Sequence, residues 1–235
     1  MIPQSSRVDR FQSQRSNSVT STPATYSEAK SNALIRDNYR CMLTGKIDAT
    51  AYIYRPALRE QLGNNPPPDV DDTECWHILP EYVISGIQNN QENRIDCPAI
   101  LKVLERFGGI SHHEFNEHGL HHWSNLMTVQ LDLRLNLDRL GVWLDPVKGL
   151  ENTYTIGRRH PGIRSDVPAT IIFTASAPTL PLPDRRYLAL HAACARVVHL
   201  SGASEAISLL IDEQARIGAL LEDGSSAELL GHLCM

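Results

Sequence analysis

The sequence predicts an α+β fold in which short strands and helices follow one another along 235 residues. Apolar residues recur at helical spacing from about residue 124 to 137. Two short runs, at 142–144 and 154–156, have the apolar, branched and aromatic composition of strands and predict a hairpin. Beyond a proline-rich stretch, residues 184–200 and 204–220 predict helices.

The N-terminal part begins with a segment that lacks apolar periodicity. Residues 1–25 are rich in Ser, Gln, Thr and Arg, so we expect a disordered tail that cannot recover the entropy of ordering. Ser27 is the expected cap of a helix that runs to about Asn38. Residues 41–43 predict a short strand that enters a turn, and residues 49–54 predict the returning strand.

The middle of the chain alternates helical segments with breakers. A short helix is expected at 56–62, and the proline run at 66–68 must end any regular structure because proline donates no backbone hydrogen bond. Helices are expected at 81–89 and 98–107. The β-branched, apolar segment 169–175 predicts a further strand.

The predicted elements divide the chain into three parts. Residues 1–25 form the tail, residues 26–175 an α+β domain, and residues 184–235 a helical C-terminal lobe packed on that domain. A chain of this length can bury one core with an added lobe.

Charge and cysteine content limit the partners and the compartment. The formal net charge is −5 and the pI is near 6.0, which disfavours a general nucleic-acid binder because such proteins neutralise phosphates with Lys and Arg. The five cysteines are odd in number and include no CxxC pair, which predicts a reducing, intracellular location in the cytoplasm or nucleus. The chain has no apolar run of about 18 residues, so we expect no membrane partner.

Three short motifs carry the strongest functional signal. They are Arg40–Gly45 (RCMLTG), Trp76–Pro80 (WHILP) and Ser124–Thr128 (SNLMT). In this order they resemble the fungal HNH-type endonuclease family, and the resemblance covers about residues 35–235. It implies a ββα-metal (HNH-like) unit around a divalent cation, with an additional β hairpin and a helical C-terminal lobe.

The resemblance also implies catalytic roles for individual residues. His77 corresponds to the histidine that activates water, and Asn125 to the asparagine that orients it. A metal-binding histidine is expected about nine residues after Asn125, but Arg134 stands there. A guanidinium does not ligate metal, so Arg134 either contacts a phosphate directly or marks a lost activity.

Each of these residues also has an ordinary structural explanation. His77 would be a partly buried histidine beside Trp76, and Asn125 would be a helix cap. Arg134 would be a solvated helix residue paired with Asp132 or Asp138. The ordered set of motifs favours the functional interpretation of His77.

A histidine-rich segment offers alternative metal ligands. Residues 112–122 contain five histidines, and this density of imidazole suits a transition metal. His121, His122 and Glu74 are the candidate ligands for Mg²⁺, Mn²⁺ or Zn²⁺. The spacing is not that of a strong zinc motif such as HExxH, and a solvated loop without any cofactor is the alternative.

Three functions follow, in order of preference. The first is an HNH-like, metal-dependent phosphodiesterase or endonuclease with a degenerate metal site, acting on nucleic acid. The second is an enzyme of fungal secondary metabolism that keeps the HNH scaffold, uses His77 as acid and base, and acts on a small molecule. The third is a non-catalytic binding protein.

Overall fold

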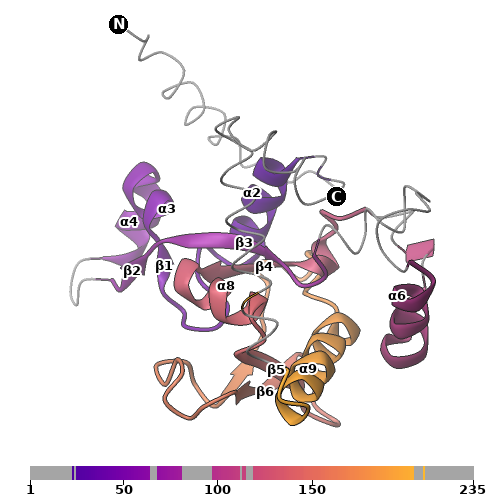
Figure 1. Cartoon of the computed structure of the whole chain (residues 1–235). Helices are drawn as coiled ribbons and strands as arrows, with labels where there is room; N and C mark the ends of the chain where they lie inside the picture. The colour runs from indigo at the N-terminus through magenta and orange to yellow at the C-terminus, as the bar shows by residue number, and fades with distance from the viewer. Residues whose placement is uncertain are drawn as a thin grey trace, which may run out of the picture.

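The computed structural model describes residues 23, 25–63, 68–80, 97–111, 113–114, 119–203 and 209. Helices and strands occur together along this part of the chain, which confirms the α+β class (Figure 1). The predicted helix at 81–89 lies outside the described residues, as do nearly all of the tail and of the helix at 204–220. No helix that the structure describes is long and apolar enough to span a bilayer.

The first described helix, α2 (Tyr26–Arg36), begins slightly earlier than the sequence predicts. Its cap is Thr25 rather than Ser27: the Thr25 hydroxyl accepts a hydrogen bond from the Glu28 backbone N–H, and the Glu28 carboxylate accepts one from the Thr25 N–H. This reciprocal capping box satisfies two amide groups at the helix start. The inner face of α2 lies on two strands and shares a small apolar cluster with them, made of Ala29, Ala33, Cys75 and Leu126.

The prediction of strands at residues 41–43 and 49–54 is wrong. Residues 42–44 form a turn. Residues 49–54 form helix α3 (Ala49–Tyr54), because the Asp48 carboxylate accepts a hydrogen bond from the Ala51 N–H at 2.6 Å and caps the helix. A well-formed cap here outweighs the aromatic, strand-like composition of a short segment.

A two-stranded parallel ladder accompanies these helices. Strand β1 (Ile47–Asp48) pairs with β2 (Val70–Asp71). The predicted helix at 56–62 is confirmed as α4 (Pro56–Leu62), which starts with a proline at its first position.

The central unit is a strand pair followed by a helix. Strand β3 (Thr73–His77) runs antiparallel to β4 (Leu126–Gln130), so that His77 lies opposite the first residue of β4. Helix α8 (Leu131–Asp138) follows β4 without a loop and lies against both strands (Figure 1). A short 3-10 turn, η3 (Trp123–Asn125), precedes β4.

The predicted helix at 124–137 is therefore wrong in its first half. All five residues of β4 are buried, so the strand lacks the alternation of apolar and polar residues that would reveal it. A fully buried strand that runs directly into a helix gives one continuous apolar pattern, and period alone cannot separate the two.

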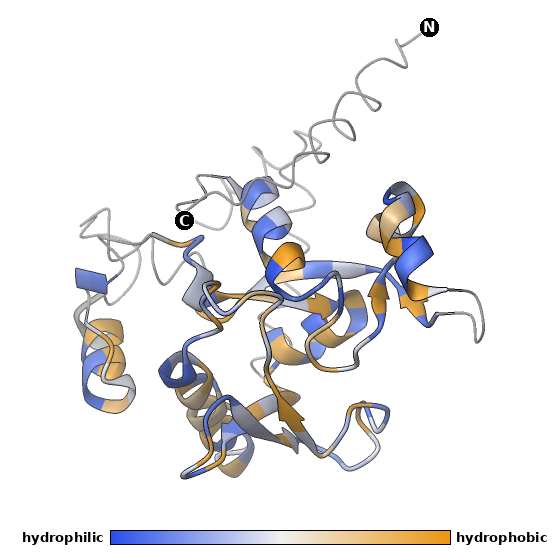
Figure 2. Cartoon of the chain, turned by 180° about the vertical axis from the view of Figure 1, so that it is seen from behind, coloured by the Kyte–Doolittle hydropathy of each residue, from blue (hydrophilic) through white to orange (hydrophobic). Residues whose placement is uncertain are grey.

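The C-terminal half adds a sheet and a long helix. The predicted hairpin is confirmed: β5 (Val142–Pro146) pairs antiparallel with β6 (Thr153–Arg158), and β7 (Thr170–Ile172) extends the sheet. Helix α9 (Arg185–Leu200) has Asp184 as its cap and packs on β5. In Figure 2 its apolar and polar residues are interspersed, as expected of a helix with one buried face.

One core joins the central unit to this C-terminal part. Side chains of α8, β5, β6 and α9 belong to the same buried cluster, and among them are Leu137, Leu144, Tyr154 and Leu188. Helix α6 (Cys97–Val103) leads into the π-helical turn η2 (Leu104–Gly108), and η2 packs next to α9. Within the described residues, α9 therefore shares the core of the preceding α+β domain.

Candidate functional site

His77 lies at the end of β3 and faces a second histidine. Its Nε2 atom is 2.9 Å from Nδ1 of His121, so one ring donates and the other accepts a hydrogen bond. Burial, followed by the interactions with His121 and Arg134, lowers the pKa of His77 to about 4. His77 is therefore neutral near pH 7 and free to accept a proton, but a pKa this far below 7 makes it a weaker base than an ordinary histidine.

Asn125 does not contact His77 directly. Its Oδ1 atom accepts a hydrogen bond from the Leu79 N–H at 2.8 Å, and its Nδ2 atom donates to the carbonyl groups of Leu79 and Leu120, both at 3.0 Å. Leu79 lies two residues after His77, and Leu120 directly precedes His121. The buried carboxamide therefore joins the segment that follows His77 to the residue before His121 and orients the pair through the backbone.

Arg134 projects from α8 onto β3. Its Nη1 atom donates to the Glu74 carboxylate, and its Nε atom is 3.4 Å from Oδ2 of Asp138. Asp138 also accepts a hydrogen bond from the Trp76 indole at 2.8 Å. The ordinary structural interpretation of Arg134 offered Asp132 or Asp138 as its partner, and the ion pair is with Asp138. Glu74 was expected to bind metal instead.

The residues predicted to bind a metal ion contact other side chains of the protein instead. Glu74 pairs with Arg134, and His121 pairs with His77. The Nδ1 atom of His122 is 2.7 Å from the Ser124 hydroxyl, and it caps the turn η3. Among the residues that the structure describes, no group of three or more His, Cys, Asp or Glu side chains could hold a metal ion. This donor set does not fit the divalent cation that the resemblance implies.

Two further residues shape this site, and sequence motifs did not indicate either of them. The Tyr26 ring lies 6.0 Å from the His77 ring, centroid to centroid, and the Tyr26 hydroxyl donates to the Cys75 carbonyl. Arg36 is fully buried and donates to the carbonyl groups of Trp123 and Leu126, on both sides of Asn125. Both side chains come from α2, whose sequence carries only a helix signal.

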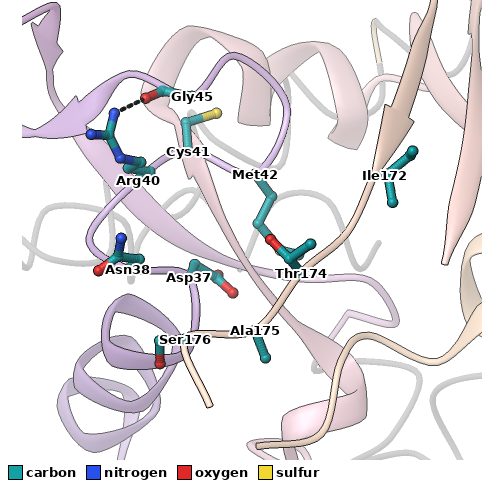
Figure 3. A pocket seen from close by; sticks show the side chains of 10 residues that line it. All are labelled: Asp37, Asn38, Arg40, Cys41, Met42, Gly45, Ile172, Thr174, Ala175 and Ser176. Carbon is teal, nitrogen blue, oxygen red and sulfur yellow. Dashed lines mark hydrogen bonds between the residues drawn. The ribbon is translucent and has the colours of Figure 1, made fainter. Parts of the chain in front are cut away.

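A polar pocket of about 280 Å³ lies elsewhere on the domain. Figure 3 shows that it opens between the turn after α2 and the segment after β7, where Arg40 donates a hydrogen bond to the Gly45 carbonyl. Neither His77, Asn125 nor Arg134 lines it. This pocket therefore does not provide a substrate cavity for the histidine pair.

The candidate site combines a hydrogen-bonded histidine pair, in which His77 is neutral near pH 7, with an arginine whose charge is balanced by carboxylates. The pair can accept a proton and pass it between the two rings. The network places one guanidinium against two carboxylates. Comparisons of this chain with protein-family models, with curated proteins and with solved structures find no match.

Proposed function

We propose that this chain is an HNH-like hydrolase of phosphodiesters in which His77 is the general base. The observation that carries the proposal is the position of a neutral, histidine-paired His77 at the end of β3, opposite a strand that leads directly into α8. This order of strand, strand and helix agrees with the ββα unit that the three sequence motifs imply.

In this proposal, His77, His121 and Asn125 have different roles in phosphodiester hydrolysis. His77 takes a proton from a water molecule, the water oxygen bonds to phosphorus, and the P–O bond to the leaving alcohol breaks. His121 is hydrogen-bonded to His77 and can return the proton to the leaving oxygen. Asn125 is a positioning residue, because its amide holds the backbone beside both histidines.

Arg134 supplies positive charge next to His77, but that charge is already balanced by Glu74 and Asp138. Stabilisation of a developing phosphate charge by a single compensated guanidinium is weaker than by an unpaired one. We therefore expect slow turnover compared with a typical nuclease.

The test is cleavage of supercoiled plasmid and of bis(p-nitrophenyl) phosphate by the wild type, by His77→Ala and by His160→Ala. His160 is exposed and serves as the matched histidine control. Each protein is assayed in EDTA and with Mg²⁺, Mn²⁺ or Zn²⁺. Cleavage that is lost in His77→Ala and kept in His160→Ala supports the proposal. Equal rates for the wild type and His77→Ala under every condition refute it.

The second candidate is acid–base catalysis on an uncharged small molecule. It is favoured by the neutrality of His77 and by the carboxylates that balance the charge of Arg134, since neither feature attracts an anionic substrate. Hydrolysis of p-nitrophenyl acetate that depends on His77, in the absence of phosphodiester cleavage, would select this candidate.

A further inference from the structure

The Arg134 guanidinium lies between two carboxylates that come from different elements. Glu74 projects from β3, and Asp138 is the last residue of α8. Arg134 donates to Glu74 and forms an i,i+4 ion pair with Asp138. Burial raises the pKa of Asp138 despite the hydrogen bond from Trp76 and the charge of Arg134, and the nearby charge of Glu74 adds a smaller contribution in the same direction. Without Arg134, this pair would carry two uncompensated negative charges.

The network is anchored on one side and open on the other. The Trp76 indole, which is only 3% exposed, holds Asp138 through a 2.8 Å hydrogen bond. Dissolved ions can reach this network, because its side chains are partly exposed: 40% for Arg134, 30% for Glu74 and 37% for Asp138. Accessible carboxylates on a rigid support are the ligands that Mn²⁺ and similar cations prefer.

Arg134 is a permanent cation at this position. Burial lowers the pKa of Arg134, but the hydrogen bond and charge of Glu74 and the charge of Asp138 outweigh that effect and raise it. A guanidinium keeps its proton throughout the physiological range. A divalent ion would therefore have to displace a charged side chain that already satisfies both carboxylates.

We infer that Arg134 is a built-in cation, which neutralises Glu74 and Asp138 and thereby excludes divalent metal ions from the position between them. The inference concerns ion binding and holds whether or not the chain hydrolyses anything. Only the correspondence between Arg134 and the metal-binding histidine of the HNH family rests on the proposed function. Failure of the cleavage assay and failure of this inference are therefore distinguishable.

A direct consequence concerns the substitution Arg134→His. It removes the permanent charge and puts an imidazole beside two released carboxylates, which makes three donors suited to Mn²⁺ or Zn²⁺. Arg134→Gln removes the same charge without adding a strong ligand, so it should create a weaker site. Arg159→His adds an imidazole at an exposed arginine elsewhere and is the matched control.

The experiment titrates Mn²⁺ into each protein and measures the bound ion from the loss of the free-ion EPR signal. Wild type and its Glu74→Gln variant should bind Mn²⁺ equally, because Glu74 is not available as a ligand. Arg134→His should bind one additional equivalent, which is lost when Glu74→Gln or Asp138→Asn is added. With Mn²⁺ about a hundredfold above Kd, its Tm should rise by roughly 5–10 °C.

Two results overturn the inference. One is Mn²⁺ binding by the wild type that disappears in Glu74→Gln, since the carboxylate would then ligate metal despite Arg134. The other is a folded Arg134→His protein, as judged by circular dichroism, that binds no more Mn²⁺ than Arg159→His. If Arg134→His does not fold, the wild-type comparison and Arg134→Gln decide the matter by the same criterion of Glu74-dependent binding.

Discussion

The carboxamide of Asn125 should contribute more to stability than most buried polar side chains. Asn125 is 1% exposed, and its amide makes three hydrogen bonds to the backbone of Leu79 and Leu120. Asn125→Ala removes all three and leaves the buried Leu79 N–H without its acceptor. A buried hydrogen bond contributes about 1 kcal/mol net, and an orphaned donor costs about 1–3 kcal/mol. We therefore expect a loss of about 4 kcal/mol in the free energy of unfolding.

Differential scanning calorimetry provides the assay. For a domain of this size, about 4 kcal/mol corresponds to a decrease in Tm of roughly 8–16 °C. Asn136→Ala is the control, because the Asn136 amide makes one exposed hydrogen bond to the Asp132 carbonyl within α8. It should change Tm by less than about 3 °C. Equal changes for the two variants would refute the role of Asn125 as the link between the segments beside His77 and His121.

Three further predictions concern parts of the core that the site depends on. Burial lowers the pKa values of His77 and His191 to about 4 from 6.5, so the unfolded state binds more protons between these values. The contribution of these two histidines to stability should be constant above pH 6.5 and should fall as the pH decreases towards 4. In urea titrations, His191→Leu should reduce the slope in this range by about 1.4 kcal/mol per pH unit. Arg36→Met should destabilise the protein by about 3–5 kcal/mol in chemical denaturation, because it leaves a buried aspartate unpaired. Gly157→Ala should lower the free energy of unfolding by about 3 kcal/mol, since a Cβ atom there would overlap the Trp143 indole.

Matched control variants distinguish these three predicted effects from non-specific destabilisation by a substitution. His160→Gln, at an exposed histidine, should leave the pH slope unchanged. Arg40→Met loses one hydrogen bond to a carbonyl and should cost about 1 kcal/mol or less. Gly141→Ala meets only ordinary contacts and should have a smaller effect than Gly157→Ala. If a control variant changes stability as much as the variant that it is paired with, the explanation given for that variant is contradicted.

Local signals in the sequence predict much of the secondary structure. Proline at the first position of α4 and the aspartate before α9 mark helix starts that depend on adjacent residues only. The hairpin of β5 and β6 follows from composition and an intervening turn. The buried strand β4 was missed, because its pairing partner lies about 50 positions earlier and its apolar pattern continues into α8.

For the candidate site, too, the sequence indicates the main residues but not the partners that they contact. Motif order indicated His77, Asn125 and Arg134, and the structure places all three on the β3–β4–α8 unit or on the turn before it. The partners of these residues depend on tertiary packing: His121 meets His77, Glu74 meets Arg134, and Asn125 bonds to backbone groups. Sequence spacing does not reveal which side chain the long segment between β3 and β4 brings beside His77. Residues that bind metal could therefore not be distinguished, from the sequence, from residues that contact other side chains.

The partners of Arg36 also set the order in which the protein can be completed during synthesis. Its guanidinium donates to carbonyl groups at Trp123, Leu126 and Pro181, the last of them 145 positions later in the chain. When α2 leaves the ribosome, none of these acceptors has yet been translated. Until residues 123–126 emerge, the charged arginine must stay hydrated or be paired with the adjacent Asp37 alone, so the backbone on both sides of Asn125 can be fixed only after that point in translation.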